Sequence, residues 1–389
     1  MSTKIASVPA FVRPVVVGIL ALAAMSQVAT INADLLAGQR NERTTEPAAL
    51  RGRLAQSLYD QVALRRLASA EALRGNDAPA QALISLAGRL GWRDSPTGLM
   101  LLDDAVRRGD ASAAMRHIDA LLRRKPELAP RLMPALHAAA TDTIGRNALI
   151  ERLDTSPPWR KEFFTRFDFI AAPSRNAHEA LLIALAEAGK PARPDEITPY
   201  VGALAQEGEI AQAHKLWITV NKNAGAGPVL DPQFGRFEPG RSAPVPNPFE
   251  WTAHRLPGIA LKVAADADKP SARNLVIATD GTAHGTVLTQ TLVLGPGRYR
   301  LFVKMPSASV LAAGGLKWMV RCLPGSRTVS TQGSAASAGW QADFAIPPSG
   351  CSAQLLSLQA RRADGHAAGE ARLEKVQAVP LAGNEGPLT

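Results

Sequence analysis

Cysteine, histidine and carboxylate side chains are the first candidates for chemistry, and their spacing predicts no catalytic centre. The sequence contains none of the short motifs that mark a nucleophile elbow, a phosphate-binding loop, a zinc protease or a dinucleotide site. A glycosidase needs two facing carboxylates, whereas Asp103 and Asp104 are neighbours that point apart on a helix. We therefore expect no catalytic residue, no cofactor and no metal site.

The seven histidines are scattered along the chain. His254 and His284 fall in the same C-terminal region as Asp266 and Asp280, so these four side chains could gather in a fold. Nothing in their spacing predicts that they do.

The two cysteines, Cys322 and Cys351, stand 29 positions apart. Two thiols cannot build a structural zinc site alone. In an oxidising compartment we expect them to form a disulfide. Cys322 ends one predicted strand and Cys351 begins another, so the bridge joins either neighbouring strands or opposed sheets.

Tryptophans supply the candidate binding residues. Trp92–Arg93 and Trp159–Arg160 each place an indole beside an arginine in a predicted inter-helix loop, which suits partner binding by stacking. In the C-terminal region, Trp251 and Trp340 are candidates for stacking on a sugar ring. Trp318 alternates with apolar neighbours and is expected in the core. For every candidate, ordinary core packing is the alternative.

The formal net charge of +10 comes mainly from arginine. A basic chain can bind nucleic acid, anionic lipid or acidic polysaccharide. The basic clusters are short and no nucleic-acid-binding signature accompanies them, so we expect no nucleic acid partner. Solvated helix faces are the alternative explanation of the charge.

An uncharged apolar run spans residues 14–33, after Lys4 and Arg13. About 20 residues in a helix cross a bilayer core, and the positive flank stays in the cytoplasm. We expect residues 1–33 to be an uncleaved anchor that leaves the remainder in the periplasm. A cleaved signal peptide, with cutting after Ala23 or Ala33, is the alternative and gives a soluble periplasmic or secreted protein.

Residues 34–222 read as a helical domain. Turn residues interrupt apolar stripes of helical spacing, so the pattern predicts short helices joined by tight turns. Gly75 and Gly109 are 34 positions apart, and Gly208 follows 99 positions after Gly109, close to three such units. The same offsets from each glycine carry small or apolar residues: Ala80, Ala114 and Ala213 at five, Ile84, Ile118 and Trp217 at nine, Ala87, Leu121 and Val220 at twelve.

This spacing resembles the tetratricopeptide repeat, in which glycine makes the turn between paired helices. The units near residues 142 and 175 fit poorly, and Pro157–Pro158 interrupts the pattern. The resemblance implies a degenerate α-solenoid whose surface binds another protein. Generic packing of helical hairpins is the alternative.

A Pro/Gly-rich stretch at 223–248 excludes helix, and the periodicity then becomes two over 249–380. Alternating runs at 259–263, 299–303 and 316–322 predict an antiparallel β-sandwich of roughly eight strands in two sheets. We expect residues 381–389 to form a flexible tail. The predicted fold class is therefore a transmembrane helix, an α-solenoid and a β-sandwich in that order.

The aromatic, glycine and cysteine order of the β region resembles the jelly roll of carbohydrate-binding modules. It runs from Phe234-Gly235-Arg236-Phe237 and Pro248-Phe249-Glu250-Trp251, through Leu294-Gly295-Pro296-Gly297-Arg298-Tyr299, to Trp318, Cys322, Trp340, Phe344, Cys351 and Gln354. The combination of anchor, repeats and jelly roll also resembles uncharacterised proteins of exopolysaccharide gene clusters in sphingomonad-type bacteria.

These resemblances imply a non-catalytic, inner-membrane protein that assists exopolysaccharide synthesis or export. The helical repeats would hold an envelope protein, and the sandwich would touch an acidic polysaccharide. Two alternatives remain open: a polysaccharide-modifying enzyme with its site in the sandwich, and a structural envelope scaffold without glycan affinity.

Overall fold

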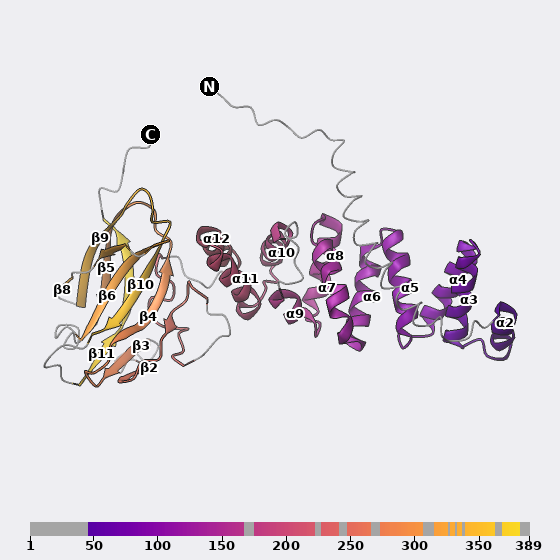
Figure 1. The fold of residues 1–389 in the computed structure, drawn as a ribbon, viewed down its shortest axis with the longest axis horizontal. Helices are drawn as coiled ribbons and strands as arrows, with labels where there is room; N and C mark the ends of the chain where they lie inside the picture. The colour runs from indigo at the N-terminus through magenta and orange to yellow at the C-terminus, as the bar shows by residue number, and fades with distance from the viewer. Residues whose placement is uncertain are drawn as a thin grey trace, which may run out of the picture. The chain divides into compact units, whose positions relative to one another are not determined.

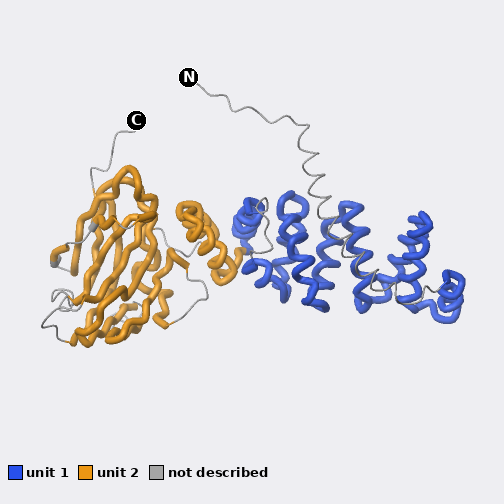
Figure 2. The backbone as a smooth tube through the Cα atoms, in the orientation of Figure 1, with its two compact units in different colours: residues 1–190 blue, residues 191–389 orange. Residues whose placement is uncertain are grey.

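The structure is a computed structural model. It describes residues 46–166, 175–221, 227–240, 247–265, 273–305, 315–325, 327–330, 333–336, 339–361 and 368–381. The chain divides into two compact units, residues 1–190 and 191–389 (Figure 2). The first unit is helical where it is described. The second contains two helices followed by antiparallel sheets.

The helices of the first unit are short and follow one another along the chain (Figure 1). They are α2 Pro47–Gln56, α3 Gln61–Leu73, α4 Asp77–Arg89, α5 Ser95–Arg107, α6 Ala111–Arg124, the 3₁₀ turn η1 Pro126–Leu128, α7 Ala129–Ala139, α8 Thr143–Asp154, α9 Arg160–Thr165 and α10 Arg175–Glu187. The second unit opens with α11 Pro194–Gln206 and α12 Ile210–Val220.

The predicted glycine turns are present and share one geometry. Gly75, Gly109 and Gly208 have φ angles of 79°, 70° and 92°, a left-handed conformation that glycine adopts without a Cβ clash. In the turn after α5, the Asp110 N–H bonds to the Ala105 carbonyl and the Gly109 N–H to the Val106 carbonyl. This pair of backbone hydrogen bonds is the Schellman motif, and α3 and α11 end with the same pair.

The positions at fixed offsets from these glycines are buried between paired helices. Ala80, Ile84 and Ala87 are at most 8% exposed, and the equivalent residues of α6 and α12 are at most 7% exposed. A small residue also sets the approach of α4 to α5, because a Cβ on Gly88 would lie 2.6 Å from a methyl carbon of Leu101. The helical region predicted from the sequence is thus confirmed.

The middle of the first unit departs from this pattern, as the proline pair predicts. Ser156 takes a φ of 48° and is followed by Pro157 and Pro158, which separate α8 from the six-residue helix α9. Phe163 and Phe164 of α9 are fully buried. Their rings contact His137 of α7 and His178 of α10, so aromatic packing replaces the small-residue contacts of the earlier hairpins.

The strands of the second unit are short and regular. They are β1 Thr252–Ala253, β2 Ile259–Ala265, β3 Arg273–Thr279, β4 Gly285–Leu292, β5 Gly297–Lys304, β6 Leu316–Leu323, β7 Thr328–Ser330, β8 Ser334–Ala336, β9 Gly339–Ile346, β10 Ala353–Ala360, β11 Gly369–Leu373 and β12 Lys375–Pro380. The alternating runs at 259–263, 299–303 and 316–322 lie in β2, β5 and β6, as predicted.

These strands form three antiparallel sheets, rather than two, among the described residues. Their orders are β1-β4-β10-β6-β7, β11-β3-β2 and β12-β5-β9-β8. Only Glu374 separates β11 from β12, so one stretch of chain pairs with β3 and then with β5. Side chains from all three sheets meet in one core, which includes Leu275, Leu301 and Leu356. The alternation of β6, with every second residue buried, follows from this one-sided packing.

Two buried glutamines bind the backbone of the segments before and between the strands. Gln290 of β4 accepts the Leu230 N–H at 3.0 Å and donates to the Leu230 carbonyl at 2.8 Å. Gln354 of β10 accepts the Leu294 N–H at 2.9 Å and donates to the Leu294 carbonyl at 3.3 Å. Both amides are at most 1% exposed, so these bonds satisfy polar groups that burial would otherwise leave unpaired.

The predicted anchor at 1–33 and, apart from Leu381, the predicted tail at 381–389 lie outside the described residues. Within the described ranges, no helix has the length and apolar character needed to span a bilayer. The predicted boundary at 223–248 differs from the boundary between the two compact units, which falls after residue 190 and places α11 and α12 in the same unit as the sheets. Independent folding on either side of 223–248 stays a prediction.

Candidate partner-binding surface

The loop between α4 and α5 carries Trp92 and Arg93, and neighbouring helices fix it. Gly91 turns the chain with a φ of 136°. Gln61, the first residue of α3, donates its side-chain amide to the carbonyls of Ala87 at 2.9 Å and Gly91 at 2.8 Å. The end of α4 is therefore tied to the start of α3.

Asp94 fixes the other side of this loop. Its carboxylate accepts the backbone N–H of Thr97 and so caps α5. The same carboxylate pairs with Arg65 of α3 at 2.6 Å, and the Arg65 side chain is only 6% exposed. Trp92 and Arg93 are thus held between two anchored residues, so their exposure belongs to an ordered loop.

Trp92 is 49% exposed and leans on His117 of α6, with ring centroids 5.2 Å apart and planes tilted by 45°. Burial and the nearby Arg116 lower the pKa of His117, which keeps the ring neutral near pH 7. Arg124, at the end of α6, donates to the carbonyl of Arg93. Trp92 is therefore an exposed indole that contacts the His117 ring and has arginines beside it.

The second predicted pair, Trp159 and Arg160, is buried instead. The indole nitrogen of Trp159 donates to Asp119 at 3.0 Å, and Trp159 is 4% exposed. Arg160 donates to the Leu153 carbonyl at 2.7 Å, and its guanidinium lies 5.5 Å from the Phe164 ring centroid. Both side chains are buried, so this placement does not support the predicted partner-binding role of the pair.

Trp251 is likewise a core residue. It is 6% exposed, its indole nitrogen donates to the Asp231 carbonyl at 3.0 Å, and its ring lies 5.4 Å from Phe234 and 6.2 Å from Trp318. Trp318 is 1% exposed, which confirms its expected core position. The buried Trp251 ring does not support the predicted stacking on a sugar.

Trp340 of β9 is half-buried and packs against the same core. A Cβ on Gly333 would lie 2.1 Å from Cζ2 of Trp340, so the Gly333 backbone sits directly on the indole. Gly333 therefore lies close against one part of the indole. This placement does not support the predicted role of Trp340 in carbohydrate binding.

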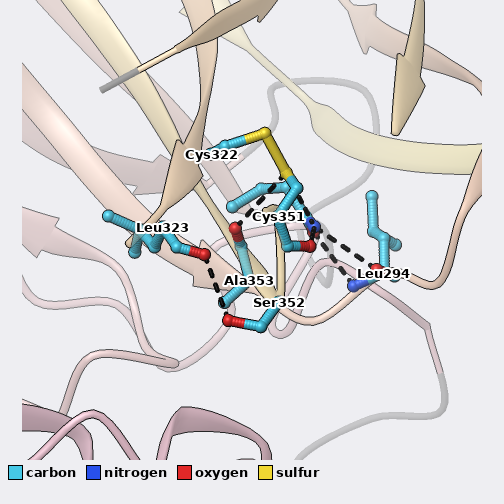
Figure 3. The surroundings of a disulfide bond; sticks show 7 residues. Leu294, Cys322, Leu323, Cys351, Ser352 and Ala353 are labelled. Carbon is cyan, nitrogen blue, oxygen red and sulfur yellow. Dashed lines mark hydrogen bonds between the residues drawn. A yellow bond between two sulfur atoms is a disulfide. The ribbon is translucent and has the colours of Figure 1, made fainter. Parts of the chain in front are cut away.

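Cys322 and Cys351 form a disulfide, with Cα atoms 4.8 Å apart (Figure 3). Cys322 is in β6, and Cys351 stands two residues before β10, which pairs with β6. The bridge therefore joins neighbouring strands of one sheet at their ends and not opposed sheets. Beside it, Ser352 donates to the Leu323 carbonyl and Gln354 donates to the Cys351 carbonyl. The predicted pairing is confirmed.

Sequence reasoning missed the pair His137 and His178, whose rings lie 5.6 Å apart in the first unit. Burial lowers the pKa of His137 to about 4, and burial together with His137 lowers that of His178 to about 3. Both residues are at most 2% exposed, so neither ring can exchange protons with a substrate in solvent. The available signal was that His137 and His178 occupy core-facing helical positions.

The scattered ionisable residues of the β region do not form a centre where they are described. His254 contacts the Thr289 hydroxyl at 2.9 Å, and Asp280 accepts the N–H and hydroxyl of Thr282 in a turn. Asp266 lies outside the described residues. In the parts of the chain that the structure describes, no three histidine, cysteine or carboxylate side chains are placed to hold a metal ion.

Comparison with known proteins gives no family for this chain. No protein-family profile matches it, and no curated protein is a significant relative. The geometry of the described residues therefore carries the functional argument.

Proposed function

We propose that the chain is a non-catalytic scaffold of the cell envelope, tethered to the inner membrane by residues 14–33, whose helical hairpins hold a protein partner. One observation carries the partner role. Of the six tryptophans, all within the described residues, Trp92 is the one that is exposed, at 49%. An exposed tryptophan beside arginine on an ordered loop is the side-chain combination that dominates binding energy at protein interfaces.

The charge around Trp92 favours an acidic segment of the partner. Arg89, Arg93 and Arg124 are exposed around the loop, whereas the carboxylate of Asp94 is already engaged by Arg65 and Thr97. An aromatic or aliphatic anchor on the partner would pack on the Trp92 ring. Carboxylates flanking that anchor would then pair with the arginines.

The finer fold assignments belong to the same proposal. The shared glycine turns and the buried alanines after them support interpretation of the hairpins as degenerate tetratricopeptide-type units. The antiparallel sheets on one core support a jelly-roll-like module in the second unit. A role in exopolysaccharide synthesis or export stays a hypothesis that rests on the resemblance alone.

We assign the exposed surface to a protein partner rather than to a glycan. Carbohydrate recognition by stacking needs an open aromatic face, and Trp251 and Trp340 have protein against their rings. Acidic polysaccharide binding by the β region would therefore have to use groups other than these two rings.

The partner role is tested with full-length, tagged protein extracted from membranes in a mild detergent. Proteins that co-purify are quantified for the wild type, for Trp92→Ala and for Ile144→Ala. Ile144 is a matched control, because it is also an exposed apolar residue of the first unit, at 71%. We expect at least one envelope protein to fall more than tenfold with Trp92→Ala and to be unchanged with Ile144→Ala. A set of partners that is the same for all three proteins contradicts the proposal.

A further inference from the structure

The turn between α2 and α3 presents two large apolar side chains to solvent. Leu58 is 71% exposed and Tyr59 is 81% exposed. The turn is nevertheless ordered: the Asp60 N–H bonds to the Ser57 carbonyl at 3.2 Å, and the Asp60 carboxylate caps α3 through the Ala63 N–H. The same carboxylate pairs with Arg53 of α2. A fixed turn that exposes leucine and tyrosine together is a candidate contact surface.

This turn lies at the same end of the helices as Trp92. Gln61, just after the turn, bonds to the Gly91 carbonyl, which places the start of α3 beside the end of α4. The bond from Arg124 to the Arg93 carbonyl adds the end of α6 to this group. Leu58, Tyr59 and Trp92 therefore share one end of the first unit, which we call the Tyr59 end, and the exposed arginines near Trp92 belong to it.

The length of chain before α2 limits how far the Tyr59 end can lie from the membrane anchor. The apolar run ends at residue 33 and α2 begins at Pro47, so 13 residues separate them. Even a fully extended chain of 13 residues spans no more than about 45 Å. If residues 14–33 sit in the bilayer, α2 and its turn are confined near the membrane surface, where even a weak contact is favoured by the short tether.

The chemistry of the Tyr59 end matches the bilayer interface. Tyrosine and tryptophan are enriched where the ring can lie among the headgroups, and leucine inserts among the acyl chains. Arginines beside them are attracted to anionic headgroups. We propose that the Tyr59 end lies on the surface of the membrane that carries the anchor, with Leu58 and Tyr59 inserted among anionic lipids. This inference rests on the membrane anchor of the proposed function.

One consequence concerns the partner. Trp92 lies at the same end, so a protein partner that packs on Trp92 would be held next to the membrane surface. An integral or peripheral membrane protein fits that position better than a freely diffusing one.

The test uses a single introduced thiol. Both native cysteines are joined in the disulfide, so Leu58→Cys supplies the one reactive thiol of the full-length chain. An environment-sensitive fluorophore on this thiol is measured after reconstitution into liposomes of phosphatidylglycerol and phosphatidylcholine. Lipids that carry a nitroxide in the acyl chain act as quenchers.

Ile144→Cys is the matched control, since Ile144 is also 71% exposed. It lies in the first turn of α8, whereas Arg152 in the C-terminal half of α8 pairs with Asp119 in the C-terminal half of α6. The C-terminal halves of α6 and α8 therefore lie together, and Ile144 belongs to the opposite end of these helices.

We expect the fluorophore at position 58 to shift to the blue and to be quenched at least threefold more than the one at 144. Liposomes without phosphatidylglycerol should reduce that difference. Co-flotation of both proteins with equal quenching overturns the inference and leaves the anchor intact. Failure of both to co-float refutes the anchor and the inference with it. A blue shift at 58 that depends on protein concentration, but not on lipid, identifies a second copy of the chain as the occupant and also overturns it.

Discussion

Asp119 accepts the indole N–H of Trp159 at 3.0 Å, across 40 residues of sequence. The same carboxylate pairs with Arg123 of its own helix and with Arg152 of α8. Asp119 is 6% exposed, so these bonds offset much of the cost of burying its charge. The tryptophan predicted to bind a partner instead joins α6 to the turn before α9.

Trp159→Ala should therefore destabilise the helical unit by about 3–5 kcal/mol, since it leaves a cavity and removes a donor from a buried carboxylate. Trp92→Ala should change the free energy of unfolding by no more than about 0.5 kcal/mol, because Trp92 lies at the surface. Urea titration followed by helical circular dichroism measures both. Equal effects of the two substitutions would contradict the assignment of one tryptophan to the core and the other to the surface.

Alanine substitution at two glycines should change the free energy of unfolding in opposite directions. Gly109 has a φ of 70°, so Gly109→Ala should cost about 1–2 kcal/mol. Gly52 lies inside α2 with open space where a Cβ would be, so Gly52→Ala should stabilise by about 0.5–1 kcal/mol. The comparison is made by thermal unfolding of the helical signal. A neutral Gly109→Ala would show that the left-handed turn is not needed.

The repeated glycines illustrate what local sequence can predict. A left-handed turn and the small residues after it depend on neighbours within one hairpin, so Gly75, Gly109 and Gly208 and their alanines were visible at fixed spacing. The strands at 299–303 and 316–322 were visible for a similar reason, since one buried face produces alternation. Cys322 and Cys351 could be paired because the chain has no other cysteine.

The burial of single aromatic residues could not be predicted from local spacing. Trp92 and Trp159 both precede an arginine in an inter-helix loop, yet Trp159 is covered because Asp119, 40 residues away, supplies its hydrogen-bond acceptor. Trp251 is covered through Phe234 and the Asp231 carbonyl, which belong to a segment without regular structure. Such long-range partners leave no periodic trace, and the same is true of the amide bonds between Gln290 and Leu230.

The disulfide should stabilise the β region. Closing a loop of 29 residues is worth about 3 kcal/mol in the chain-entropy account. Guanidinium unfolding of the wild type, followed by the β circular dichroism signal, should shift to lower denaturant when a reductant is added. Cys322→Ala/Cys351→Ala should unfold like the reduced wild type and should not respond to reductant. A midpoint that is unchanged by reduction would show that the bridge adds no stability.

Mild acid should weaken the helical unit through His137 and His178. Because burial lowers their pKa values to about 4 and about 3, the folded chain keeps both rings neutral while the unfolded chain binds protons near pH 6.5. The free energy of unfolding should therefore fall as the pH drops from 6.5 towards 4, by about 1.4 kcal/mol per pH unit for each histidine.

His137→Leu removes one of these two groups and should reduce that slope, with little pH dependence from either residue above pH 7.5. Urea titrations of the helical signal at several pH values, for wild type and variant, make the comparison. An identical slope between pH 4 and 6.5 in both proteins would contradict the neutral, buried state of His137.

The membrane-tethered scaffold depends most directly on where the full-length chain resides. A C-terminally tagged protein is expressed in its native host, cells are fractionated, and washed spheroplasts are treated with protease. We expect an uncleaved protein in the inner membrane, resistant to alkaline extraction, whose helical and β units are digested from the outer side of that membrane. A soluble periplasmic protein shortened by about 20–33 residues, the range set by cutting after Ala23 or Ala33, would contradict the tether. A full-length protein protected inside intact spheroplasts would contradict the envelope location.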